Sequence, residues 1–222
     1  MYKFLDLLFN FNDGKKINFE RSIFYGIFIF FFSLLICNLS FGQLRDSVRI
    51  KNRVFDVIYS EKLEQPKVLI YRSINRPQNV TRSGLDFYTE PNIKTSDNND
   101  YAANVWDKGH LAPAGTFTDS IHLMKQTFSF LNCVLQDQYL NRGEWRLLEE
   151  QERKWDDVEP LTVKVEVLFN SNSKRLPTGA VIPSHFRKHI YFEKSKKWKC
   201  FLFPNSKPTI VWQKSEIVCN NH

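Results

Sequence analysis

Four adjacent residues near the middle of the chain combine side chains suited to general acid–base chemistry. Asp107, Lys108, Gly109 and His110 stand in a row, and Pro113 closes the segment. Histidine titrates near pH 6.5, so its neutral imidazole can accept a proton from water at neutral pH. The lysine adds positive charge, and the glycine beside the histidine allows a ligand to approach the backbone closely. A single histidine is more often structural, so this hypothesis depends on the residues that follow.

Two further candidates lie on the strongest helix signal in the sequence, which predicts a helix over residues 142–158. Asn141 stands where this helix would begin, and Glu149 follows eight residues later, about 12 Å along a regular helix. An amide oxygen and a carboxylate suit a hydrated Mg²⁺, which keeps several waters and takes few direct protein ligands. Alternatively, Asn141 is a helix N-cap and Glu149 a solvated residue, and the helix alone favours this second interpretation.

The elements that must position these residues are mostly strands. Residues 162–169 alternate between apolar and charged side chains, as expected of a half-buried strand. The expected strands are rich in Val, Ile and aromatic residues and lie at 54–59, 68–71, 128–134, 162–169, 189–192, 199–203 and 210–212. Residues 75–100 are polar and predict a loop. The pattern indicates an α+β domain that is rich in strands and has one central helix.

The N-terminal part of the chain carries a targeting signal. From Ser22 to Leu44 there are 23 consecutive residues without a charge, Arg21 precedes them, and Ser40 and Gly42 mark their end. An apolar centre that ends in small residues is typical of a cleaved secretory signal. The uncharged run, residues 22–44, is also long enough to remain as a membrane anchor. We therefore expect a signal peptide or signal anchor at 1–42 and an exported domain at 43–222. This domain would be secreted or periplasmic, or held at a membrane.

Composition and charge narrow the classes of protein. Hydrophobic residues make up 42% of the 222 residues and charged residues 25%, which excludes both wholesale disorder and a polytopic membrane protein. The chain has a formal charge of +7, and residues 161–222 hold eleven Lys or Arg against three acids. This basic third is either a solvated face or a binding surface for a polyanion, of which nucleic acid is the commonest.

Three cysteines follow residue 42, and an exported domain permits a disulfide between two of them. They are Cys133, Cys200 and Cys219. We prefer the pair Cys200–Cys219, because a returning strand could bring these two together.

The segments with chemical side chains together resemble the DNA/RNA non-specific endonuclease family, the sugar-non-specific nucleases with a ββα-metal site. The family pattern is Asp-Arg-Gly-His, then a strand Asn-x-x-Pro-Gln, then Asn-x-x-x-Trp-x-x-x-Glu on a crossover helix. The corresponding residues here are Asp107–His110, Asn132–Gln136, and Asn141 with Trp145 and Glu149. The resemblance continues through 179–188 and 203–205 and covers roughly residues 50–210. It implies a ββα-metal nuclease fold, with an antiparallel sheet and a central metal-binding crossover helix.

The resemblance also implies the roles of the residues that would act on water and metal. His110 matches the general base that activates water. Asn141 matches the single direct protein ligand of Mg²⁺, for which Mn²⁺ could substitute, and no organic cofactor is implied. Glu149 matches the catalytic carboxylate that holds the water molecules around the metal.

Three further residues would meet the substrate or support the site. Arg82 resembles the upstream arginine of the family that contacts the phosphate. Lys108 replaces the arginine of the motif and so trades a bidentate fork for a point charge. Asn132 supports the site and is grouped with Arg82 and Lys108 on the substrate side, whereas Leu135 replaces the usual proline.

The resemblance therefore predicts an exported, Mg²⁺-dependent endonuclease that hydrolyses phosphodiester bonds in DNA and RNA. Contacts to phosphate and sugar carry no sequence information, so low sequence specificity is expected. Two alternatives remain at this point. One is an exported nucleic-acid-binding protein with weak or no catalysis, and the other is a phosphodiesterase that acts on a smaller substrate.

Overall fold

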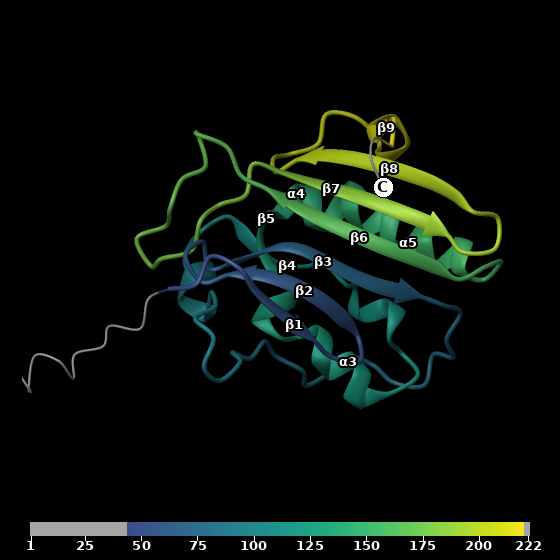
Figure 1. Ribbon diagram of the computed structural model, residues 1–222, viewed down its shortest axis with the longest axis horizontal. Helices are drawn as coiled ribbons and strands as arrows, with labels where there is room; N and C mark the ends of the chain where they lie inside the picture. Colours follow the sequence, from purple (N-terminus) through teal and green to yellow (C-terminus); the bar gives the residue numbers. More distant parts are fainter. Residues whose placement is uncertain (1–43, 220–222) are drawn as a thin grey trace, which may run out of the picture. The chain divides into compact units, whose positions relative to one another are not determined.

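The computed structural model describes residues 44–219, so the expected signal or anchor at 1–42 lies outside the described residues. These residues form one compact α+β unit around an antiparallel sheet of seven strands in the order β1-β2-β3-β6-β7-β8-β9 (Figure 1). The strands are β1 (Val48–Lys51), β2 (Phe55–Ser60), β3 (Gln65–Ser73), β6 (Leu161–Leu168), β7 (His185–Phe192), β8 (Lys197–Pro204) and β9 (Glu216–Ile217). Within the described range, no helix has the length and apolar character needed to cross a membrane.

A separate two-stranded hairpin and a helix supply the ββα unit. The hairpin pairs β4 (Trp106–His110) with β5 (Cys133–Asp137) in antiparallel register. The chain then enters the short helix α4 (Gln138–Leu140), a π-helical turn (Asn141–Trp145) and helix α5 (Arg146–Asp156). Figure 1 shows α5 lying along one face of the large sheet. The candidate site therefore combines a hairpin with a helix that is fixed to the sheet.

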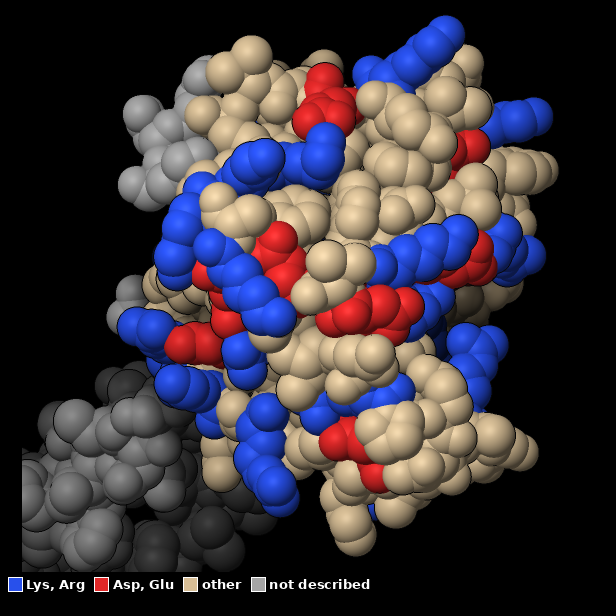
Figure 2. All heavy atoms as spheres, turned by 90° about the vertical axis from the view of Figure 1, so that its right-hand side faces the viewer, with Lys and Arg blue, Asp and Glu red and all other residues tan. Residues whose placement is uncertain are grey.

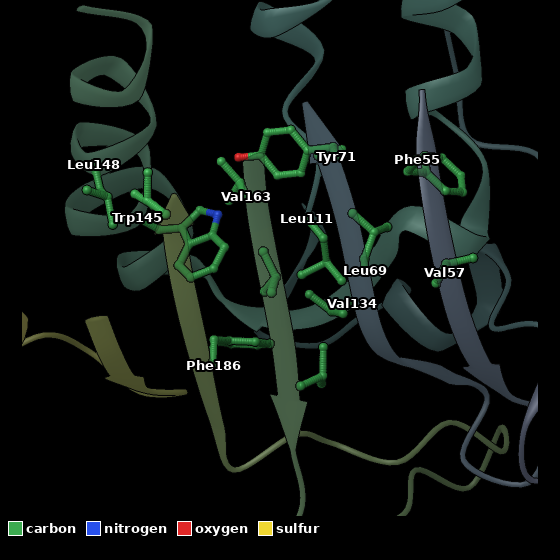
Figure 3. Close-up of a cluster of buried hydrophobic side chains, with 14 of the residues drawn as sticks. Phe55, Val57, Leu69, Tyr71, Leu111, Val134, Trp145, Leu148, Val163 and Phe186 are labelled. Carbon is green, nitrogen blue, oxygen red and sulfur yellow. The ribbon is translucent and has the colours of Figure 1, made fainter. Parts of the chain in front are cut away.

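The hydrophobic core lies between α5, the hairpin and the large sheet. Trp145 is 1% exposed and packs on Phe186 and Phe203, with ring centroids 5.6 and 5.7 Å apart. Leu148 follows on the same side of the helix, and Figure 3 shows it next to Trp145, whose ring points toward the strands of the large sheet. Burying side chains of this size contributes about 1.5–3 kcal/mol each. The core thus holds the helix that carries Asn141 and Glu149 at a fixed place on the sheet.

The helix differs from the prediction of a regular helix over residues 142–158. It begins earlier, where Asp137 Oδ1 accepts the backbone N–H groups of Tyr139 and Leu140. Gly143 then has φ −106° and ψ −113°, which is not helical, within the π-helical turn. Because Asp137 is the N-cap, the alternative that Asn141 caps the helix is wrong. Asn141 lies in a widened turn, a feature that often occurs at functional sites.

Several other elements also differ from the prediction. The strand expected at 128–134 begins only at Cys133, because Ser129 Oγ caps a 3-10 turn over Phe130–Asn132. Residues 210–212 are not a strand, since Trp212 instead starts a 3-10 turn (Trp212–Ser215). The sequence analysis also missed β1, β4, β9 and a second helix, α3 (Ile121–Thr127). The strand β4 lacks β-branched residues, so only its pairing with β5 reveals it.

The preferred disulfide, Cys200–Cys219, is confirmed, with Cα atoms 5.3 Å apart. It fastens the C-terminal segment to β8. Trp212 in that segment packs against Trp155 of α5, with ring centroids 6.0 Å apart. Its backbone N–H donates to Glu144 Oε2 at 2.7 Å, in the same turn as Asn141. The disulfide therefore holds a segment that contacts the helical region on both sides of Glu149.

Candidate active site

The hairpin sets the direction of each side chain in the row from Asp107 to His110. Alternation along β4 directs Lys108 and His110 to one face and Asp107 and Gly109 to the other. A Cβ atom on Gly109 would lie 2.2 Å from Oε1 and 2.7 Å from Cβ of Gln136 on β5. Only glycine therefore allows the two strands to pair with Gln136 in this place.

His110 lies in an aromatic setting. Its ring centroid is 4.8 Å from that of Phe87 and 4.9 Å from that of Phe128. Its Nε2 is shielded from solvent and has no hydrogen-bond partner. Burial, with a smaller contribution from the positive charge of Arg82, lowers the pKa of His110 from 6.5 to about 3. The imidazole is consequently neutral at neutral pH, as a general base must be.

Lys108 lies on the same face of β4 as His110, and its ammonium group already has protein partners. Its Nζ donates to Asn98 Oδ1 at 2.5 Å and lies 3.4 Å from Asp86 Oδ1. The ammonium group also lies over the rings of Phe87 and Phe130, at 5.4 and 5.8 Å from their centroids. The side chain of Asp86 is 78% exposed. A phosphate group could therefore replace this exposed carboxylate beside Lys108.

Asp107 connects the hairpin to the turn that contains Asn141. Asn141 Nδ2 donates to Asp107 Oδ2 at 2.9 Å, and Arg142 donates to both oxygens of the same carboxylate at 2.7 and 2.6 Å. Burial opposes ionisation of Asp107, but the bonds from Arg142 and Asn141 outweigh it and lower the pKa of this carboxyl. Since the amide nitrogen is held by Asp107, the amide oxygen of Asn141 is left for another ligand.

Glu149 lies beside a buried network of charges. Its Oε1 is shielded from solvent and has no hydrogen-bond partner. The neighbouring Glu152 accepts Lys188 Nζ at 2.8 Å and the hydroxyl of Tyr71 at 2.5 Å, and all three side chains are almost fully buried. Burial raises the pKa of Glu149 from 4.5 to about 7, against the opposing effect of Lys188. A cation near Glu149 would therefore favour its charged form.

The amide oxygen of Asn141 and Oε1 of Glu149 suit a hydrated Mg²⁺. They do not suit a metal that needs many protein ligands. No cluster of three or more His, Cys, Asp or Glu that could hold a metal occurs among residues 44–219. Mg²⁺ commonly keeps several waters and is bound through one or two protein oxygens. The free amide oxygen of Asn141 and the unpartnered Oε1 of Glu149 are two such protein oxygens.

Comparison with known proteins gives the family. Residues 36–220 match the model of the DNA/RNA non-specific endonuclease family. The chain belongs to this family. It is 32% identical to the mitochondrial nuclease EXOG of Homo sapiens over 132 residues, which are 51% of this chain and 35% of that protein. It is 30% identical to the EXOG of Xenopus laevis over 145 residues, which are 56% of this chain and 40% of that protein.

A solved structure confirms the fold. A chain in the crystal structure of the EndoG/EndoGI complex superposes with a TM-score of 0.66 at 22% identity. The match covers 80% of this chain and 82% of that chain. The expected ββα-metal nuclease fold is thus confirmed. The matches span less than half the length of the curated EXOG relatives.

The structure brings only some of the expected family residues into contact. Asp107 links β4 to Asn141, but within residues 44–219 no hydrogen bond or ion pair joins His110 to Asn141 or Glu149. Arg82 is exposed and acts on His110 through its charge. The sequence analysis placed Asp107 in one segment with His110 but gave it no partner elsewhere in the chain. It did not foresee the bond to Asn141, because these residues lie 34 positions apart.

Asn132 does not lie on the substrate side, so its grouping with Arg82 and Lys108 requires correction. It is fully buried, its Oδ1 accepts the N–H of Ala112 at 2.8 Å, and its Nδ2 donates to the carbonyls of Ala112 and Thr127. All of these groups belong to the protein itself. Asn132 therefore clamps the segment that follows His110 and has no free group for a substrate.

The basic residues of the C-terminal third do not form one unbroken positive surface. Lys164 and Arg187 both pair with Glu166, and Lys199 pairs with Glu216. Lys188 is fully buried. Figure 2 shows one face of the molecule, on which bands of Lys and Arg are interrupted by acidic side chains. Phosphate contacts should therefore come from the lysines that have no acidic partner.

Proposed function

We propose that this protein is an exported, Mg²⁺-dependent endonuclease that hydrolyses phosphodiester bonds of DNA and RNA without sequence specificity. Membership of the DNA/RNA non-specific endonuclease family supports the class of reaction. The observation that carries the proposal is the bond from Asn141 Nδ2 to Asp107, three residues from His110 on one strand. It couples the expected metal ligand to the strand that bears the expected general base.

His110 would take the proton of the attacking water. The ring is neutral, but its burial and, to a smaller extent, the charge of Arg82 make it a weak base in the free protein. A bound phosphate would compensate the charge of Arg82 and raise the pKa of His110. Substrate binding would thus strengthen the base at the moment when it is needed.

Asn141 and Glu149 would hold the metal, Asn141 through its amide oxygen and Glu149 through water. When bound, Mg²⁺ supplies positive charge to the phosphate and to the leaving oxygen. Arg82 and Lys108 would add fixed positive charge on the face of β4 that carries His110. Lys108 would move from Asp86 to the phosphate, since that carboxylate is exposed and loosely bound.

Low sequence specificity and export complete the proposal. The residues assigned here address phosphate, water and metal, and such contacts position a strand without reading its bases. The Cys200–Cys219 disulfide supports an oxidising compartment, and the uncharged run at 22–44 supports secretion, periplasmic location or anchoring at a membrane.

Digestion of plasmid DNA and of RNA by residues 43–222 tests this function. Cleavage of both substrates is expected with Mg²⁺, and none with EDTA. Asn141→Ala should lose activity or need far more Mg²⁺, whereas Arg142→Ala, which changes an exposed neighbour in the same turn, should cleave like the parent protein. Cleavage in EDTA by Asn141→Ala would refute the metal mechanism, and inactivity of the parent protein in Mg²⁺ would refute the function.

A further inference from the structure

A cavity lies at the end of the hairpin away from His110. It has a volume of about 330 Å³ and lies between Trp106 and the long loop between β6 and β7, at 169–184. Figure 1 shows this loop projecting beyond the end of the large sheet. The cavity also includes Asn172, Lys174 and His185 on its wall. Its volume is within the range of small-ligand sites, about 300–1,000 Å³.

Trp106, which lines this cavity, lies on the same strand as Lys108 and His110. It is the first residue of β4, so alternation along the strand directs Trp106, Lys108 and His110 to the same face. Along an extended strand, Trp106 and His110 lie about 13 Å apart. The indole is partly exposed, and no aromatic ring among residues 44–219 stacks on it. A flat, unoccupied aromatic surface of this kind can stack a base.

Three polar side chains of the cavity are also without a protein partner, whereas Asn170, Ser173 and Ser184 are hydrogen-bonded within the wall. Across residues 44–219, no hydrogen bond or ion pair involves the side-chain amide of Asn172, the ammonium of Lys174 or the ring of His185. An amide can bond the edge of a base, and lysine can bind a phosphate. The set of an aromatic ring, a cation and an amide is therefore the chemistry that recognises a nucleotide.

The wall of the cavity is held to the hairpin. Asn205 Nδ2 donates to the carbonyl of Pro183, which lines the cavity, and to the carbonyl of Leu135 on β5. Asn205 Oδ1 accepts the N–H of Asp137, the residue that pairs with Trp106 across the hairpin. Pro183 and Trp106 thus keep a fixed relation, so this part of the cavity wall is present without a ligand.

We infer that this cavity binds one unpaired nucleotide of the substrate strand, with its base stacked on Trp106 and its phosphate near Lys174. The inference rests on the proposed nuclease function and specifies its substrate. A base can enter the cavity only when it is not paired, so the site favours single-stranded DNA and RNA over duplex. The base is recognised through its flat surface, which is consistent with low sequence specificity.

Binding in EDTA, in a His110→Ala background, tests the inference without cleavage. The probes are a fluorescent oligothymidylate, a duplex hairpin of equal length, and an oligomer of abasic deoxyribose phosphates. Trp106→Ala should weaken binding of the oligothymidylate about tenfold, within the range known for one stacked base. It should leave duplex and abasic binding nearly unchanged, and Trp106→Phe should restore most of the affinity.

Lys174→Ala should weaken binding of all single-stranded probes, including the abasic oligomer, whereas Lys51→Ala on the distant edge strand β1 should not. Equal affinity of Trp106→Ala and its parent for oligothymidylate would overturn the inference. An equal loss for all three probes would also overturn it, because it would mark Trp106 as structural. Cleavage by the wild-type protein in Mg²⁺ is a separate measurement, so a failed nuclease assay and a failed stacking site can be told apart.

Discussion

The amide nitrogen of Asn141 lies 2.9 Å from Oδ2 of Asp107, and this bond joins the π-helical turn to strand β4. An amide whose nitrogen is held in this way presents its oxygen in a fixed direction. Arg142 binds the same carboxylate from an exposed position. Asp107 therefore acts as an orienting group for the expected metal ligand, and its effect can be separated from that of its arginine partner.

Asp107→Ala should raise the Mg²⁺ concentration needed for half-maximal cleavage by about 10–100-fold, the usual cost of losing an outer-shell partner of a metal ligand. Arg142→Ala serves as the control, because its side chain is 68% exposed and surface ion pairs contribute little. Titration of activity with Mg²⁺ measures both. An unchanged Mg²⁺ requirement in Asp107→Ala would show that Asn141 is oriented by other groups.

His110→Ala should lower the turnover of DNA by at least about a hundredfold, since this is the usual contribution of a general base. Binding of DNA should persist, because His110 is not a phosphate contact in this proposal. Rates at saturating DNA, together with binding in EDTA, check both statements. Near-normal cleavage by the variant would remove His110 from the mechanism.

The pH dependence of kcat/KM should reflect the lowered pKa of His110. Since this pKa is about 3, the acid limb should lie well below pH 6.5. Arg82→Ala removes one cause of the lowering and should move the limb to higher pH, whereas Arg82→Lys keeps the charge and should not. An acid limb near pH 7 that does not move in either variant would indicate that Glu149, whose pKa is about 7, is the titrating group.

The same shift affects the stability of the fold. Between pH 6.5 and about 3 the unfolded chain binds a proton at His110 that the folded chain does not. This histidine therefore lowers the free energy of unfolding as the pH falls through that range. Urea unfolding at a series of pH values should show a shallower acid loss for His110→Gln than for the wild-type protein. Parallel curves would mean that the folded ring binds the proton as readily as the unfolded one.

Gly109→Ala should destabilise the protein by about 1–3 kcal/mol, the usual cost of an overpacked site. The added Cβ meets Cβ of Gln136 at 2.7 Å, so shortening the glutamine to alanine cannot relieve it. Gly115→Ala is a suitable control, since its nearest neighbour is the flexible end of Arg153 at 3.3 Å. Chemical denaturation of the two variants measures the difference, and equal stability would contradict the close approach.

Binding of duplex DNA should weaken steeply with salt, by about 0.9 log unit per log unit of salt for each phosphate contact. Charge reversal at Lys194, Lys196 or Lys197 should flatten this slope without changing which sequences are cut. Reversal at Lys199 should have a smaller effect, because Glu216 already pairs with it at 3.0 Å. Affinities measured over a range of salt concentrations test this. If the logarithm of the affinity did not change with that of the salt concentration, these lysines would not contact the phosphates of the substrate.

The sequence predicted the parts of the fold that depend on local pattern. Strict alternation placed β6 within one residue at each end, and the ordered chemical segments identified the family. The preferred cysteine pair was also correct. These predictions are correct because periodicity and short spacings are visible in the sequence of a single segment.

Features that depend on distant partners could not be predicted in this way. The strand β4 has the composition of a loop and is extended only because β5 pairs with it. The widened turn at Asn141 follows from the backbone of Gly143, in a segment whose side chains otherwise favour a regular helix. Asn132 matched the family pattern, but only its burial and its bonds to Ala112 and Thr127 show that it faces inward.

The Cys200–Cys219 bridge has a consequence for the cell that makes this protein. A crosslink across 19 positions stabilises a fold by about 3 kcal/mol through the unfolded chain. Thiols stay reduced in the cytosol, so in a newly made chain there Trp212 would contact Trp155 of α5 and Glu144 of the π-helical turn without that support. The same residues would be fastened only after the chain meets an oxidant. Under the proposed export, the nuclease fold would therefore be fully stabilised only after the chain has left the cytosol.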